Sequence, residues 1–141
     1  MRKQIWAVLF VAMILGVASA MAAPTGDGRP PDEDIRKKIV GEWHADITKT
    51  NFSAHASDKF EAEGKYSSTA ELEIGVRHVT ISVEGKWEVK DGMLKETITK
   101  SSNPEYPPIG LVTNDKVVRI DDKEFVYQDD RNEMVTCKRV K

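Results

Sequence analysis

The chain contains a single cysteine, Cys137, among its 141 residues. One cysteine cannot form an intramolecular disulfide, so the fold must depend on its hydrophobic core or on a partner chain. No cysteine follows the N-terminal apolar run, where a lipoprotein would carry one, and we therefore expect no lipid or other membrane anchor. We expect Cys137 itself to be a buried core thiol rather than a reactive one.

Runs of lysine and arginine are also missing. The sequence has 21 Lys and Arg residues against 23 Asp and Glu residues, a formal net charge of −2. Nucleic acid requires a basic face, so we exclude nucleic acid as a partner. Neither a nucleophile-elbow motif nor a phosphate-cradling glycine loop is present, and no pair of carboxylates is marked for acid and base roles. We therefore expect no enzymatic activity.

The sequence also lacks a motif with the spacing typical of metal ligands. His44, His55 and His78 do not stand at a short paired spacing with another ligand. The acidic pairs at 121–122 and 129–130 lack the spaced acids and central glycine of an EF-hand, and they are typical of hairpin turns. We therefore expect neither a metal ion nor a cofactor.

The N-terminus has the three parts of a secretory signal peptide. Two basic residues precede an apolar run over 5–17, and small residues at 18–20 supply an A-x-A cleavage pattern. The run is shorter than the ~20 residues of a spanning helix, which favours cleavage over a signal anchor. We predict a signal peptide over 1–20, cleaved after Ala20 or after Ala22. Without a lipidation signal or a disulfide framework, we expect a bacterial protein, exported to the periplasm or secreted.

Residues 21–31 are rich in glycine and proline, which predicts a flexible leader. The remaining segment, 32–141, has the length of about one domain. Its first ten residues, 32–41, begin with acids, end with bases and close on a glycine. These signals predict one short helix.

After the helix, apolar and polar residues alternate with a period of two, which is typical of strands with one buried face. The clearest strand is 79–89, and the Asp91-Gly92 pair predicts a tight hairpin that returns along 94–99. Further strand-like runs lie at 43–48, 54–61, 65–74, 116–120, 124–128 and 134–140. We predict seven or eight short antiparallel strands in meander order, closed into an up-and-down β-barrel because closure removes exposed edges.

Alternation also predicts which side chains face the barrel interior. The candidates are Tyr66, Leu72, Ile81, Val83 and Trp87. Such residues either line a ligand cavity or fill a packed core, and the sequence leaves both alternatives open. In the run 124–128, Phe125 and Tyr127 share one face and Val126 takes the other, so the sequence leaves open which face points into the barrel.

The segment Gly41-Glu42-Trp43 resembles the Gly-x-Trp signature of lipocalins and of the smaller bacterial lipocalin-like domains. The segment 85–94 resembles the hairpin that those small domains carry in mid-sequence. In lipocalins an arginine on or after the last strand packs over this tryptophan, and Arg139 stands at the corresponding position. The resemblance implies an eight-stranded barrel that binds a small apolar ligand, with Gly41, Trp43 and Arg139 as its structural signature.

The segment 101–110 contains three prolines, which make it difficult to add to a sheet. Tyr106 and Ile109 give this loop an apolar side. It either covers one end of the barrel or presents a recognition surface. The second alternative predicts an envelope protein-interaction module, of the inhibitor or immunity type, with an exposed Tyr106 and a filled barrel. Ligand carriage instead predicts a cavity lined by Tyr66 and Trp87 that opens to solvent.

Overall fold

The computed structural model describes residues 28–103 and 105–141. The signal peptide predicted over 1–20, and residues 21–27 of the predicted leader, lie outside the described residues. One short helix precedes eight strands: α2 (Asp32–Ile39), β1 (Gly41–Lys49), β2 (Phe52–Phe60), β3 (Lys65–Ile74), β4 (Arg77–Lys90), β5 (Met93–Ser101), β6 (Val112–Ile120), β7 (Glu124–Gln128) and β8 (Met134–Arg139).

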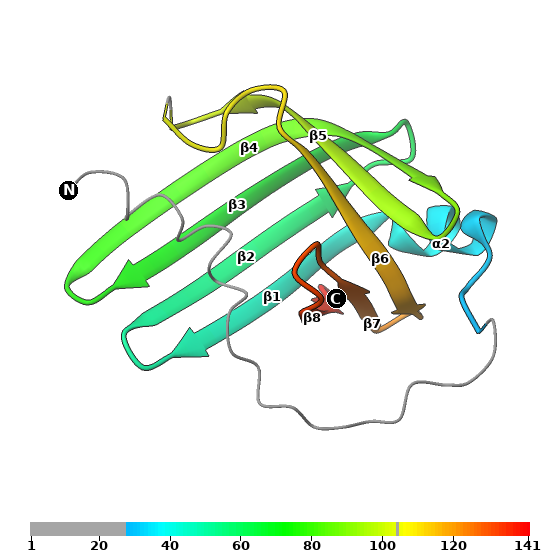
Figure 1. Cartoon of the computed structure of the whole chain (residues 1–141), viewed down its shortest axis with the longest axis horizontal. Helices are drawn as coiled ribbons and strands as arrows, with labels where there is room; N and C mark the ends of the chain where they lie inside the picture. The colour runs from blue at the N-terminus through cyan, green and yellow to red at the C-terminus, as the bar shows by residue number, and fades with distance from the viewer. Residues whose placement is uncertain (1–27, 104) are drawn as a thin grey trace.

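Each strand pairs with the next, and β8 pairs with β1, so that the eight strands form a closed barrel. All eight pairings are antiparallel. This confirms the predicted up-and-down barrel preceded by one helix. Figure 1 shows β1 to β4 as long neighbouring ribbons, with β6, β7 and β8 crossing them in front.

The predicted hairpin between β4 and β5 is formed by Asp91 and Gly92. Both residues have positive φ, 54° at Asp91 and 74° at Gly92. Two positive φ values match the right-handed twist of a two-residue hairpin, and aspartate and glycine both tolerate them. The Asp-Gly pair therefore fixes the register of β4 against β5.

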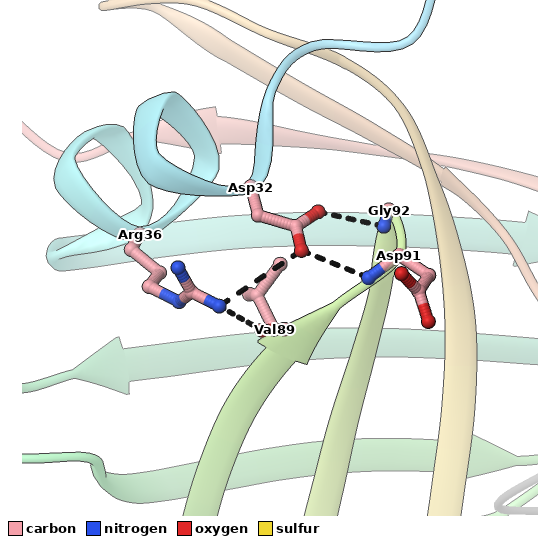
Figure 2. Close-up of polar contacts among 5 residues, drawn as sticks. All are labelled: Asp32, Arg36, Val89, Asp91 and Gly92. Atoms are coloured by element: carbon pink, nitrogen blue, oxygen red, sulfur yellow. Dashed lines mark hydrogen bonds and ion pairs between the residues drawn. The ribbon is translucent and has the colours of Figure 1, made fainter.

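Helix α2 is attached to this same turn. The Asp32 carboxylate accepts hydrogen bonds from the backbone N–H groups of Asp91 and Gly92, both at 2.8 Å (Figure 2). Arg36 donates a hydrogen bond of 2.5 Å to the carbonyl of Val89. The bond from Gly92, foremost among these contacts, lowers the pKa of Asp32. The first two turns of the helix are thus tied to the end of β4.

The apolar side of α2 closes one end of the barrel. Ile35 and Ile39 are fully buried, and so is Trp43 at the start of β1. The Trp43 indole donates its N–H to the carbonyl of Ile39 at 2.7 Å. These residues belong to the main core cluster, and a smaller cluster of Ala54, Leu72 and Ile81 lies further along the sheet.

Arg139 lies over Trp43, as the lipocalin resemblance implies. Its Cζ atom is 4.2 Å from the indole centroid. The guanidinium also donates hydrogen bonds of 3.0 Å to the carbonyls of Val40 and Asp122. A Cβ atom at position 41 would approach Arg139 Nη1 to 2.5 Å, and Gly41 has a φ of +131°. The glycine of the Gly-x-Trp motif therefore leaves room for the arginine.

The barrel closes along a short seam. β1 pairs with β8 at two positions, Trp43 with Arg139 and His44 with Lys138. By contrast, β1 pairs with β2 along its full length, and β3 pairs with β4 from Lys65 to Ile74. Figure 1 shows the resulting asymmetry, with β1 to β4 reaching well beyond the shorter strands β7 and β8.

Candidate functional site

A hollow lies between the inner faces of β3, β4, β5 and β6 and the loop that joins β5 to β6. Its volume is about 140 Å³. Its polar lining consists of Tyr66, Ser68, Glu96, Tyr106 and Thr113, and its apolar lining consists of Ala70, Ile81, Val83, Ile98, Pro107 and Leu111. A cavity of about 150 Å³ is large enough to bind benzene. This barrel cavity can therefore hold a molecule with the bulk of about one ring.

Small side chains face inward on the adjacent strands β2 and β3. Ala56 of β2 pairs with Ala70 of β3, and two residues along, Asp58 pairs with Ser68. Protein interiors are otherwise packed as densely as organic crystals, so neighbouring small residues leave space that larger ones would fill. Ser68 and Ala70 are the small residues of β3 that line the cavity, where larger side chains would fill the space.

Three carboxyl side chains face the same interior. Asp58 accepts a hydrogen bond of 3.1 Å from the Tyr66 hydroxyl, and Glu96 accepts one of 3.2 Å from the Thr113 hydroxyl. Asp115 stands two residues after Thr113 and therefore on the same face of β6. The three groups come from β2, β5 and β6, and the fold brings them together across the barrel.

Burial raises the pKa of each of these carboxyl groups. The pKa of Glu96 is raised well above its usual value by burial and then by the negative charges of Asp58 and Asp115. Burial, followed by the charges of Asp129, Asp130 and Asp58, raises the pKa of Asp115 to about 7. Burial raises the pKa of Asp58 too, against the lowering effect of its hydrogen bonds. Desolvation disfavours the charged form, so these groups hold protons more strongly than exposed acids do.

The loop between β5 and β6 forms one wall of the cavity through Tyr106 and Pro107. The side-chain oxygen of Asn103 accepts hydrogen bonds from the backbone N–H groups of Glu105, at 2.8 Å, and Tyr106, at 3.3 Å. Tyr106 is half-buried, whereas Ile109 is 72% exposed. The two residues proposed for a partner surface therefore differ, since one belongs to the cavity and the other faces solvent.

The five side chains predicted to face inward lie in different parts of the interior. Tyr66, Ile81 and Val83 line the cavity. Trp87 belongs to the main core cluster, and Leu72 belongs to the smaller cluster. In β7, where the sequence left open which face points inward, Phe125 and Tyr127 pack with the main cluster.

Reasoning from the sequence missed the interior carboxyl groups. Each of them interrupts an inward face that is otherwise largely apolar or small, as Glu96 does between Leu94 and Ile98. Asp58 and Asp115 occupy equivalent places in β2 and β6. An acid at the inward phase of a strand is the signal that could have identified them. The arrangement offers an apolar wall beside hydrogen-bonding and acidic groups, which suits a small molecule with one polar end.

These features define a class, the closed eight-stranded up-and-down β-barrel with a small internal cavity, which is consistent with a lipocalin-like fold. No protein-family model matches the chain, and a search of curated proteins found no match to it. Within the described ranges 28–103 and 105–141, no helix is long and apolar enough to span a membrane.

Proposed function

We propose that this chain is an exported, lipocalin-like binding protein that carries one small molecule in the barrel cavity. The observation that carries the proposal is the cavity itself, a volume of about 140 Å³ lined by four strands and a loop. Barrels of eight strands are either filled by their own side chains or hold one small ligand. Small inward residues at this place support the second alternative. The proposed role is binding without chemical change to the ligand.

The competing proposal is an envelope protein-interaction module that binds through the loop between β5 and β6. It requires an exposed Tyr106 above a filled interior. Tyr106 is instead half-buried and lines the cavity. Ile109 remains available on the surface, but one exposed apolar side chain is ordinary for a soluble domain. Ligand carriage is therefore the better supported of the two functions.

The first experiment is native mass spectrometry of the mature protein purified from its own periplasm or culture medium. The same sample is measured again after denaturation, which removes any molecule bound without a covalent bond. We expect a discrete excess mass, of the order of 100 daltons for a ligand of about one ring, that disappears on denaturation. A clean mass for the protein alone would favour the interaction module instead.

A variant that fills the cavity tests whether the bound molecule occupies this place. Ala70→Leu adds three carbon atoms at the cavity wall and should remove the excess mass from a folded protein. Glu71→Leu is the matched control, because Glu71 is the next residue of β3 and is exposed on the outer face. The control should retain the ligand. If both variants retained it, the ligand would bind elsewhere on the chain.

A further inference from the structure

The cavity has both apolar and polar lining. Ile81, Val83 and Ile98, on the neighbouring strands β4 and β5, are apolar. Glu96 and Thr113 are polar and pair with each other across β5 and β6. A molecule that fills this space would meet both hydrocarbon and a carboxyl group.

Glu96 has unused capacity to accept hydrogen bonds. Its Oε2 atom accepts the bond from Thr113. Across residues 28–103 and 105–141, no donor is found for its other oxygen, Oε1. This oxygen is also not among the fully buried atoms without a partner, so it is reachable from the space around it. Because Glu96 lines the cavity, Oε1 is placed to meet a bound molecule.

The interior carboxyl groups have no ion-pair partner in the described part of the chain. Among the ion pairs within the described residues, none involves Asp58, Glu96 or Asp115. Of the three carboxyl groups, Asp58 has a basic neighbour, His44, which lowers its pKa. Buried carboxylates without a partner cost stability, so they either bind protons or are compensated by a cation from outside.

We propose that the ligand is a small primary amine, with its ammonium group on Glu96 Oε1 and a hydrocarbon body of about one ring against Ile81, Val83 and Ile98. This inference rests on the proposed function, because it names the chemical class of the molecule in the same cavity. An ammonium supplies the charge and the hydrogen-bond donors that Glu96 lacks, and hydrogen bonds between charged groups are the strong ones. The apolar lining residues explain why the body of the ligand is hydrocarbon rather than a second polar group.

Three ring compounds of similar size test this class. Benzylamine, benzyl alcohol and benzoate differ in the charge of one group, and their binding to the mature protein is measured by isothermal titration calorimetry at pH 7. We expect benzylamine to bind at least about tenfold more tightly than benzyl alcohol, and benzoate to bind most weakly, because a charge-assisted hydrogen bond is worth more than a neutral one. Benzylamine binding should also release a proton, since burial raises the pKa of Glu96. Titrations in two buffers with different ionisation enthalpies measure that release.

The variant Glu96→Gln keeps the shape of the side chain and removes its charge. It should lower benzylamine affinity about tenfold or more, leave benzyl alcohol within about threefold, and abolish the proton release. Glu71→Gln is the matched control, because Glu71 is exposed on the outer face of β3 and should change neither ligand. Both variants are first checked for the near-ultraviolet circular dichroism of the folded protein.

The outcomes separate the two proposals. Benzyl alcohol or benzoate binding as tightly as benzylamine would overturn the amine assignment and leave small-molecule carriage standing. The same holds if Glu96→Gln had no effect on benzylamine. Failure of all three compounds to bind the wild-type protein, together with a clean native mass, would overturn carriage in the cavity and the amine assignment with it.

Discussion

Arg139 connects segments that are far apart in the sequence. Besides its contact with the Trp43 ring, its guanidinium donates hydrogen bonds to the carbonyls of Lys38, Val40 and Asp122. The N–H groups of Arg139 therefore reach the end of α2, the residue just before β1 and the turn after β6. A planar guanidinium can do this because its five N–H groups have a fixed geometry.

We predict that Arg139→Lys destabilises the domain by about 1 to 3 kcal/mol, because an ammonium cannot serve all three carbonyls and also stack on the indole. Urea unfolding followed by tryptophan fluorescence measures the change. Lys138→Gln is the control, since Lys138 is exposed on the outer face of β8 and should change stability by less than about 0.5 kcal/mol. Equal losses in the two variants would contradict the role given to Arg139.

The raised pKa of Asp115 determines how stability depends on pH. Burial and the charges of Asp129, Asp130 and Asp58 raise that pKa from 3.8 to about 7. Between these values the folded state binds more protons than the unfolded state, so the free energy of unfolding falls as pH rises. The contribution is greatest below about pH 4 and is lost by about pH 7, with a slope of at most about 1.4 kcal/mol per pH unit for one group.

We predict that Asp115→Asn raises the free energy of unfolding at pH 8 and leaves it nearly unchanged at pH 4. Glu96 and Asp58 retain their own raised pKa values, so a shallower slope should remain. Urea unfolding at a series of pH values measures the slope. The control is Asp91→Asn, in an exposed turn where asparagine also tolerates positive φ. A variant slope identical to that of the wild type would show that Asp115 is not the titrating group.

At the scale of the element, β4 bends through an irregularity between Glu84 and Gly85, where its register against β5 shifts. A Cβ atom at position 85 would lie 2.2 Å from the carbonyl oxygen of Thr97 on β5. Only glycine fits a backbone approach of this kind. Irregularities of this kind bend a strand and increase its twist.

We predict that Gly85→Ala destabilises the domain by about 1 to 3 kcal/mol, because the added Cβ atom would clash with the backbone of β5, which cannot move without disturbing the sheet. Thermal unfolding followed by far-ultraviolet circular dichroism measures the loss. Gly75→Asn provides the comparison, since Gly75 has a φ of +60° with nothing within 4 Å of a Cβ atom, and asparagine tolerates that conformation. The prediction fails if the two variants unfold at the same temperature.

The elements were predictable where the inward face of a strand is apolar. The bounds of β7, Glu124–Gln128, agree with the sequence, because the apolar run 125–127 is flanked by the polar residues Glu124 and Gln128. β6 begins at Val112, four residues before the predicted start at Lys116. The missed residues include Asp115, an acid on the inward face of the strand. Prediction from the sequence missed the candidate site because the site residues interrupt the alternating pattern from which strands are recognised.

For the molecule as a whole, the single thiol reports on global opening. Cys137 is 1% exposed and lies in the main core cluster. Burial, with added effects from Asp58, Glu96 and Asp115, raises its pKa well above the usual value. Because the thiolate is the reactive form, both burial and pKa protect the group.

We predict that iodoacetamide modifies Cys137 at least about a thousandfold more slowly than an exposed cysteine. The reaction requires the domain to unfold, and the free energy of unfolding is about 5 kcal/mol or more. Mass spectrometry of timed samples gives the rate. The control is Thr136→Cys in a Cys137→Ala background, since Thr136 is the exposed neighbour on the same strand. Comparable rates for the two thiols would show that β8 opens locally without unfolding of the barrel.

The short seam between β1 and β8 also affects the order in which the barrel forms. Neighbouring strands can pair as each leaves the ribosome, but Arg139 meets Val40 across 99 residues of chain. Contacts of such high sequence separation form late, because a long loop must close before they yield any stabilisation. Until that strand is available, the nascent sheet remains an open ribbon with Trp43 uncovered. The ring therefore closes last, after the pairs of neighbouring strands have formed.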